Sequence, residues 1–282
     1  MFSDFFFDDE LLRKIADETN RHVQEIIKTA GNITRKSQWY EWKDVSVEEM
    51  RVFLGFIMNM SLNEKPAMED YFSTDLLTKQ DFFTTIFTRR RFLQIFRGLH
   101  LAPPPTPDQA GDSRSTRGQK VADIVGHIDS KCRAMFSPGQ DVCVDESTIG
   151  FKGRIIFKCY NPQKPTKWGI RVYVVADSKT GYVCGFVPYF GSPTNDALIR
   201  PDLPFTSRIV LHLLQKIQMD CPAGGRHVYT DRFYTGVELA EELLKLKTHT
   251  TGTIMGNRKN LPLEVSFTMK NYIFFTNIVI LK

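Results

Sequence analysis

The chain has 282 residues, of which 42% are hydrophobic and 24% are charged, so it can bury an ordinary globular core and is not a disordered chain. That length suffices for two modest domains or for one large one. A formal net charge of +5 is compatible with binding to nucleic acid, but it is equally compatible with simple solubility.

Apolar residues recur at helical spacing through the first hundred residues. They predict one helix over about 11–27 and another over about 89–99. Between these, Ser46 and Glu49 form a capping box, which predicts the start of a third helix that runs to about residue 58. The first part of the chain is therefore predicted to be a packed helical domain.

A loop interrupts this domain. Residues 101–119 are rich in proline, glycine, serine and aspartate and lack apolar periodicity, which is typical of a linker or a long loop. A further helix is predicted at about 120–134. We therefore expect the helical domain to cover residues 1–134.

Strand patterns replace the helical ones after residue 137. Three runs predict a meander, a helix follows, and then come a fourth strand, a helix opened by a capping box of Thr235 and Glu238, and a fifth strand. The predicted strands cover residues 141–145, 169–175, 182–189, 227–230 and 251–254, and the first predicted helix covers 206–218. This order predicts an α/β fold.

The cysteines and the start of the chain bear on the compartment. No cysteine spacing is typical of a zinc site, so free thiols, a reducing compartment and no zinc are expected; the five are Cys132, Cys143, Cys159, Cys184 and Cys221. No basic region followed by an apolar stretch opens the chain, and no apolar run approaches the ~20 residues of a membrane helix. A cytosolic or nuclear protein is expected.

Two aspartates stand at the ends of predicted strands. Asp145 ends the first strand, and Asp231 follows the fourth. Carboxylates in such positions can be brought together and can hold Mg²⁺, which favours oxygen ligands. Aspartate after a strand is also a common turn former or helix cap, so spacing alone leaves both interpretations open. Glu146 should point to the opposite face from Asp145 if the strand continues.

The segment between the first two strands is basic. Residues 147–176 contain no acidic residue, and aromatic residues are interleaved with the cations. The cations are Lys152, Arg154, Lys158, Lys164, Lys167 and Arg171, of which Arg171 lies within a strand and could be structural. Such a patch beside candidate metal ligands suits a DNA backbone, and the alternative is a solvated basic hairpin. Arg232, next to Asp231, joins the residues expected to bind DNA.

The sequence lacks the motifs of several other enzyme classes. The histidines show no spacing with glutamate that is typical of zinc proteases, no glycine-rich phosphate loop follows a strand, and no G-x-S-x-G motif occurs.

Several motifs resemble those of piggyBac transposases. Residues 144–154 (VDESTIGFKGR) and 160–170 (YNPQKPTKWGI) resemble the segments around and after the first catalytic aspartate of that family. Residues 187–191 (VPYFG) resemble the strand that follows, and residues 229–235 (YTDRFYT) resemble the segment of the second catalytic aspartate. Parts of the first helices, around Trp42 for example, are also similar, so the resemblance covers about residues 1–262.

The resemblance implies a DDE recombinase with an RNase H-like catalytic core, a mixed sheet with flanking helices, preceded by an α-helical dimerisation and DNA-binding domain. Asp145 and Asp231 would be catalytic and would bind the metal, Mg²⁺ or Mn²⁺ in its place. The implied partners are double-stranded DNA at transposon ends, a TTAA-type target and a second copy of the chain. Nuclear localisation is implied as well.

The family carries a third catalytic aspartate downstream of the second, and the last acidic residue here is Glu264. We therefore expect a partial core over residues 135–265, an atypical tail over 266–282, and impaired strand cleavage and transfer. The tail could be an aberrant end or an authentic terminal strand. The alternative function is a domesticated or decayed DNA-binding protein without catalysis, and a weaker third one is a purely structural interaction protein.

Overall fold

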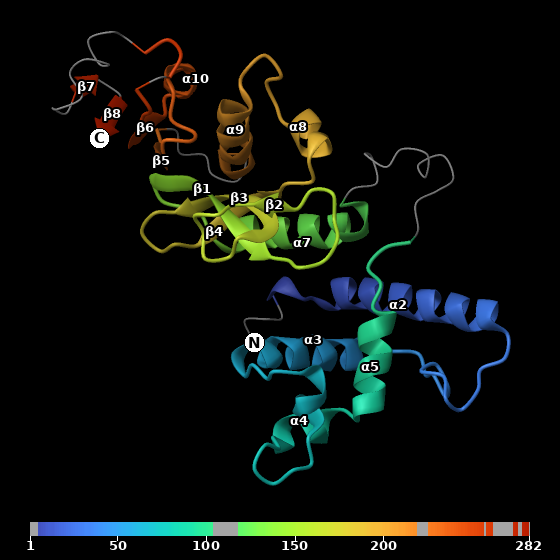
Figure 1. Cartoon of the computed structure of the whole chain (residues 1–282). Coiled ribbons are helices and arrows are strands. Elements are labelled where there is room, and N and C mark those ends of the chain that lie inside the picture. Colours follow the sequence, from blue (N-terminus) through green and yellow to red (C-terminus); the bar gives the residue numbers. More distant parts are fainter. Residues whose placement is uncertain are drawn as a thin grey trace. The chain divides into compact units, whose positions relative to one another are not determined.

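The computed structural model describes residues 5–103, 118–218, 225–256, 258–261, 273–275 and 278–281. The chain forms two compact units, residues 1–127 and residues 128–282, and the boundary falls within one helix (Figure 1). No helix in the described ranges is long and apolar enough to cross a membrane.

The first unit is helical, as predicted. Each of the three helices predicted in the first hundred residues is present, and two short elements that had not been predicted lie between the second and the third. The elements are α2 (Asp9–Ala30), α3 (Val47–Leu62), the 3₁₀ helix η1 (Met68–Phe72), α4 (Asp81–Ile86) and α5 (Arg89–Gly98). Of the predicted loop, residues 104–117 lie outside the described residues.

Aromatic side chains fill the core of this unit. Phe56 is almost fully buried, and its ring centroid lies 4.9 Å from that of Phe83 and 4.7 Å from that of Phe92. Tilted and edge-on ring pairs of this kind contribute beyond the apolar area that they bury. The packing accounts for much of the high phenylalanine content of the chain.

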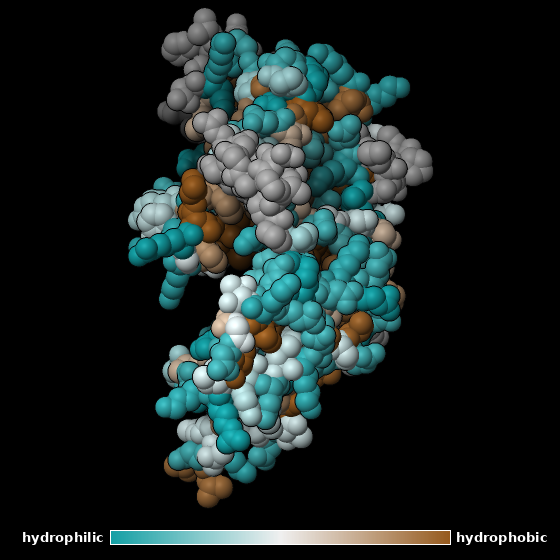
Figure 2. Space-filling model, turned by 90° about the vertical axis from the view of Figure 1, so that its right-hand side faces the viewer, coloured by the Kyte–Doolittle hydropathy of each residue, from teal (hydrophilic) through white to brown (hydrophobic). Residues whose placement is uncertain are grey.

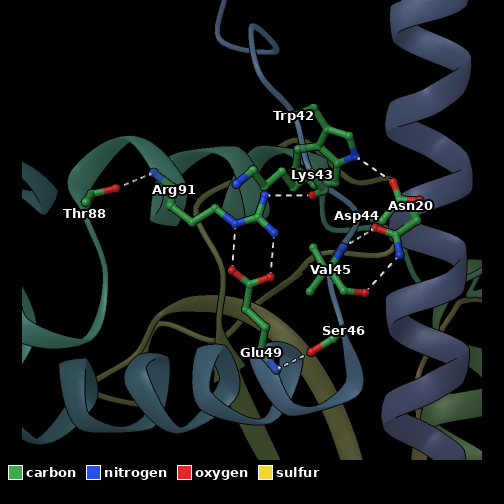
Figure 3. Close-up of polar contacts among 9 residues, drawn as sticks. All are labelled: Asn20, Trp42, Lys43, Asp44, Val45, Ser46, Glu49, Thr88 and Arg91. Carbon is green, nitrogen blue, oxygen red and sulfur yellow. Dashed lines mark hydrogen bonds and ion pairs between the residues drawn. The ribbon is translucent and has the colours of Figure 1, made fainter.

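Ser46 and Glu49 open α3 in a way that confirms half of the expected capping box (Figure 3). The Ser46 hydroxyl accepts the N–H of Glu49 at 3.2 Å, so the predicted N-cap is confirmed. The Glu49 carboxylate instead binds Arg91 of α5 through two bonds, Nε to Oε1 at 2.6 Å and Nη2 to Oε2 at 2.5 Å. This bidentate pair ties the start of α3 to α5.

The segment before α3 is fixed to its neighbours by polar contacts (Figure 3). The Asn20 side chain of α2 donates to the Val45 carbonyl at 3.0 Å and accepts the Val45 N–H at 2.8 Å. Arg91 donates to the Lys43 carbonyl at 2.9 Å and lies over the Trp42 ring, 5.0 Å from its centroid. These bonds position an otherwise irregular stretch of backbone.

Most of the surface visible in Figure 2 is hydrophilic, and the hydrophobic residues on it form small, separate groups. One such group lies at the lower end of the view, where Figure 1 places the loop between η1 and α4. Leu76 and Leu77 are strongly exposed in that loop, Leu77 at 95%. Scattered groups of this size are ordinary for a protein surface.

The second unit combines one sheet with helices. Its strands are β1 (Asp141–Gly150), β2 (Cys159–Tyr160), β3 (Trp168–Asp177), β4 (Val183–Pro188), β5 (His227–Thr230), β6 (His249–Thr253), β7 (Ile273–Phe275) and β8 (Ile278–Leu281). Its helices are α8 (Ser192–Ala197), α9 (Phe205–Gln218) and α10 (Val237–Lys245), and α7 (Gln119–Met135) contains the boundary between the units.

The strand order is that of the expected RNase H-like core. β3 pairs antiparallel with both β4 and β1, β1 pairs in parallel with β5, and β5 pairs in parallel with β6. Three antiparallel strands followed by parallel ones make the predicted mixed sheet, so the predicted fold class is confirmed. β2, which had not been predicted, pairs antiparallel with the first two residues of β3, on the same edge of β3 as β4 and opposite β1.

The meander has the predicted form but a longer first strand. β1 continues five residues past the predicted end at residue 145, because residues 146–150 pair with residues 169–173 of β3. The turn between β3 and β4 is closed by the Asp177 N–H, which donates to the Tyr182 carbonyl at 2.9 Å, and Gly181 adopts the positive φ that the turn requires.

One face of the sheet carries the core of this unit. Val142 and Val144 of β1 point to this face and lie in one buried cluster with Leu213 of α9 and Leu239 of α10. Figure 1 shows α9 over the sheet. Cys132 and Cys184 are buried thiols, and the four described cysteines are all free, as expected.

The capping box predicted at Thr235 is wrong. The N-cap residue of α10 is Gly236, and no side chain caps that helix. The Thr235 hydroxyl instead lies 2.8 Å from the Thr230 hydroxyl and donates to the Asp231 carbonyl at 2.7 Å. The tertiary contact with β5 thus takes the hydroxyl that local sequence had assigned to the helix end.

In the last seventeen residues, β8 pairs in parallel with β6, and β7 pairs antiparallel with β8. The sheet thus includes residues 273–275 and 278–281.

Candidate active site

Asp145 and Asp231 come together because their strands are parallel neighbours. In the β1–β5 ladder Val144 lies opposite Thr230, and each aspartate is the next residue on its strand or just after it. Both therefore lie at the same end of adjacent strands. The structure thus brings the two predicted site residues side by side, and both are accessible to solvent.

Asp145 carries a charge that its surroundings disfavour. Its Oδ1 accepts the N–H of Glu146 at 2.8 Å. Loss of hydration, together with the negative charges of Glu146 and Asp231, raises the pKa of the Asp145 carboxyl above its ordinary value, although that hydrogen bond acts to lower it. A bound cation would relieve this repulsion.

Asp231 is held by a tight turn after β5. Its Oδ1 accepts the Phe233 N–H at 2.8 Å, and its carbonyl accepts the N–H groups of Tyr234 at 3.2 Å and Thr235 at 3.0 Å. The side chain thus acts as a turn former with one oxygen. Since a carboxylate has two oxygens, this role leaves capacity for a metal ligand.

The two carboxylates fit a hard divalent cation. Mg²⁺ is commonly held by one or two carboxylates, with water and phosphate oxygens in its other positions. Within the described ranges no group of three or more His, Cys, Asp or Glu side chains is placed to hold a metal ion. Among the described residues Asp145 and Asp231 remain the candidate ligands, and Glu264 lies outside the described residues.

The cations expected to bind DNA fall into two groups. Lys152, Arg154, Lys167 and Arg232 are exposed. Lys164 is engaged within the protein, with its Nζ 3.3 Å from Glu146 Oε1.

Lys158 lies beside an aromatic surface. Its Nζ is 5.2 Å from the centroid of the Trp168 ring and donates to the Gly153 carbonyl at 2.9 Å. Trp168 and Tyr160 are each about half exposed, and their ring centroids lie 4.5 Å apart. Exposed rings next to exposed cations are the combination that binds nucleic acid by stacking and by charge.

A second basic surface, in the first unit, was missed by sequence reasoning. It is an open groove of about 450 Å³, which we call the arginine groove. Its lining residues are Arg35, Lys36, Ser37, Gln38, Arg89, Arg90, Leu93 and Arg97. The signal available in the sequence was two short basic runs, residues 35–36 and 89–91, whose proximity only the fold reveals.

The arginine groove is short of negative charge. Glu69 pairs with Arg89 at 3.2 Å, and Arg35, Lys36 and Arg97 form no ion pair among the residues that the structure describes. Arg89 also lies in the first turn of α5, which contains no acidic residue, so the helix dipole adds to the positive potential there.

The chain is similar to known proteins over most of its length. Residues 1–274 match the family model described as Transposase IS4. The human PiggyBac transposable element-derived protein 3 is 23% identical over 223 residues, which are 79% of this chain and 36% of that protein. The human chimeric ERCC6-PGBD3 protein is 23% identical over 223 residues, which are 79% of this chain and 20% of that protein.

A cryo-EM structure of a piggyBac transposase synaptic complex with hairpin DNA contains a similar fold. Its TM-score to this chain is 0.73 at 22% sequence identity, and the match covers 96% of this chain and 55% of that chain. The chain thus spans about a third of the length of the first human relative and about half of the solved transposase chain.

Proposed function

Because the chain belongs to the Transposase IS4 family and is of the piggyBac type, we propose that it binds DNA and holds a divalent cation between Asp145 and Asp231. Transposition is the activity of this family. The observation that carries the proposal is the position of the two carboxylates at one end of adjacent parallel strands, with exposed cations on the segments beside them.

The proposed ion is Mg²⁺, with Mn²⁺ as a substitute, because both aspartates offer hard oxygen ligands. A pair of such ions, when bound, activates the attacking oxygen and stabilises the leaving oxygen of a phosphodiester. Asp145 and Asp231 would orient the cation, while Lys152, Arg154, Lys167 and Arg232 would hold the DNA backbone. Lys158 and the rings of Tyr160 and Trp168 would support an unpaired base.

Residues 1–282 alone are expected to give no hairpin product on a transposon-end duplex with Mg²⁺ or Mn²⁺. Among the described residues no group of three carboxylates is placed to hold a metal, whereas the family's site has three, and loss of one ligand removes much of the electrostatic stabilisation. Denaturing electrophoresis of end-labelled DNA measures this. If the unmodified chain gives hairpin product and Asp145→Ala does not, the expectation that this chain is inactive is wrong.

A DNA-binding protein without catalysis is the second candidate, and the arginine groove favours it. Arg35→Ala with Lys36→Ala is expected to weaken binding of a DNA duplex about 10-fold at low salt and to reduce the slope of log K against log salt by about 2. Fluorescence anisotropy across a salt series measures both. Lys14→Ala with Lys28→Ala on α2 removes the same charge elsewhere and should have a smaller effect. Equal effects would argue against the groove.

We further propose that residues 1–134 serve DNA binding and self-association, that the target is of the TTAA type, and that the protein acts in the nucleus, where its substrate is. Mass measurement in solution tests self-association. Competition between duplexes with and without TTAA tests the target preference, and imaging of the tagged chain tests the location.

A further inference from the structure

Glu146 is a largely, but not fully, buried carboxylate one residue from the candidate metal ligand Asp145. β1 continues past residue 145, with Glu146 opposite Tyr173 of β3, so the Glu146 side chain points to the other face of the sheet from Asp145. Its side chain is only 17% exposed. A carboxylate in such a place needs specific partners to offset its lost hydration.

Two partners from distant parts of the chain supply them. The Tyr234 hydroxyl donates to Glu146 Oε2 at 2.9 Å. Lys164 Nζ lies 3.3 Å from Glu146 Oε1 and also donates to the Glu146 carbonyl at 3.0 Å. Burial acts to raise the pKa of Glu146, but the bond from Tyr234 and the charge of Lys164 outweigh it and leave that pKa lowered.

Each partner belongs to a segment of the candidate site. Tyr234 lies in the turn that holds Asp231, since its own N–H donates to the Asp231 carbonyl, and its ring is 1% exposed in the core of the second unit. Lys164 lies in the basic segment between β2 and β3. Glu146 itself is bonded to Asp145 through its N–H. The Glu146 residue thus connects Asp145 on β1, the turn that contains Asp231, and the basic segment that contains Lys164.

We propose that Glu146, together with Tyr234 and Lys164, is a positioning residue that fixes the Asp145 and Asp231 segments relative to each other and holds the basic segment beside them. This inference rests on the proposed function insofar as Asp145 and Asp231 bind a cation. Glu146 does not bind that cation, because its carboxylate faces the core side of the sheet.

Calorimetric titration of the full chain with Mn²⁺ tests the proposal. Tyr234→Phe removes only the hydroxyl and is expected to weaken Mn²⁺ binding about 10-fold, the usual size of an effect from a group that orients a ligand. Glu146→Gln, which keeps a hydrogen-bond acceptor, should weaken binding less than Glu146→Ala does. Tyr173→Phe is the matched control, because it removes the hydroxyl of another buried tyrosine of the same sheet, whereas the hydroxyl that donates to Glu146 is that of Tyr234.

A second readout does not depend on metal. Hydrogen exchange of residues 231–235 and tryptic cleavage within residues 151–167 should both become faster in Tyr234→Phe and Glu146→Gln, and unchanged in Tyr173→Phe. A general loss of stability would instead speed exchange throughout the second unit.

The outcomes separate the positioning role from the metal site. Unchanged Mn²⁺ affinity in Tyr234→Phe would overturn the positioning role. A loss of Mn²⁺ affinity in Glu146→Gln as severe as in Asp145→Ala would also overturn it, because Glu146 would then be a metal ligand. If Asp145→Ala binds Mn²⁺ like the unmodified chain, the proposed metal site is wrong. Local exchange and cleavage then decide the positioning role alone, and unchanged rates in both segments would overturn it.

Discussion

Replacing Asp145 by asparagine is expected to lower the affinity for Mn²⁺ at least about 100-fold, because it removes one of the two carboxylates that the described site offers. The measurement is the rise in melting temperature that Mn²⁺ produces. A ligand at free concentration c that binds only the folded state stabilises it by RT ln(1 + c/Kd), so at a fixed Mn²⁺ concentration the rise should disappear in a variant whose Kd is far higher.

In the absence of metal, the same substitution should raise the melting temperature of the protein rather than lower it. The raised pKa of Asp145 means that its charge costs folding free energy at neutral pH, chiefly through lost hydration and then through repulsion from Glu146 and Asp231. Asp145→Asn should therefore raise the melting temperature of the metal-free protein. This trade of stability for function is typical of sites that gather like charges.

Asp196→Asn is the matched control, since Asp196 is an exposed aspartate on α8 of the same unit. It should leave both melting temperatures unchanged. If Asp145→Asn keeps the Mn²⁺-dependent rise in melting temperature, the cation site lies elsewhere.

Gly252→Ala is expected to destabilise the second unit by about 3 kcal/mol, because the site has no room for a methyl group. A Cβ atom there would stand 2.3 Å from the Thr230 carbonyl oxygen and 2.3 Å from Thr235 Oγ1. Thr230 pairs with Gly252 in the β5–β6 ladder, so the carbonyl cannot retreat without loss of strand pairing. The Thr235 hydroxyl holds the Asp231 carbonyl, so the turn would move too.

Urea unfolding followed by far-ultraviolet circular dichroism measures this effect, with Trp168 fluorescence reporting on the second unit and Trp39 and Trp42 on the first. Gly126→Ala on α7 is the control, because nothing lies within 4 Å of the position that its methyl group would take and alanine favours a helix by about 1 kcal/mol. A loss below about 0.5 kcal/mol in Gly252→Ala would mean that the strands separate easily there.

The order of helices and strands followed from the sequence because it depends on the period of apolar residues. Asp145 and Asp231 could be proposed as neighbours for a related reason: Asp145 ended one predicted strand and Asp231 followed another, and sites of α/β sheets form at strand ends. That the two strands are parallel neighbours is known only from the structure. The length of β1 could not be predicted, because residues 146–150 become a strand only through pairing with β3.

The errors have a common physical origin in contacts between distant residues. Serine three residues before glutamate predicted the cap of α3 correctly, but the Glu49 carboxylate is taken by Arg91, 42 residues away. Thr235 failed as a cap because Thr230 lies beside it in the fold. The arginine groove likewise joins residues 35–38 to residues 89–97, and no local pattern encodes that proximity.

The spacing of Asp145 and Asp231 depends on backbone pairing between β1 and β5, whose axes lie about 4.8 Å apart in any sheet. Main-chain hydrogen bonds are kept through most side-chain substitutions, so the pairing of β1 and β5 would persist even in a protein that had lost catalytic activity. A descendant of a transposase could lose catalysis by a substitution elsewhere and still present two carboxylates at the same end of adjacent strands. Such a scaffold would be available for a regulatory or architectural role long after mobility had ended.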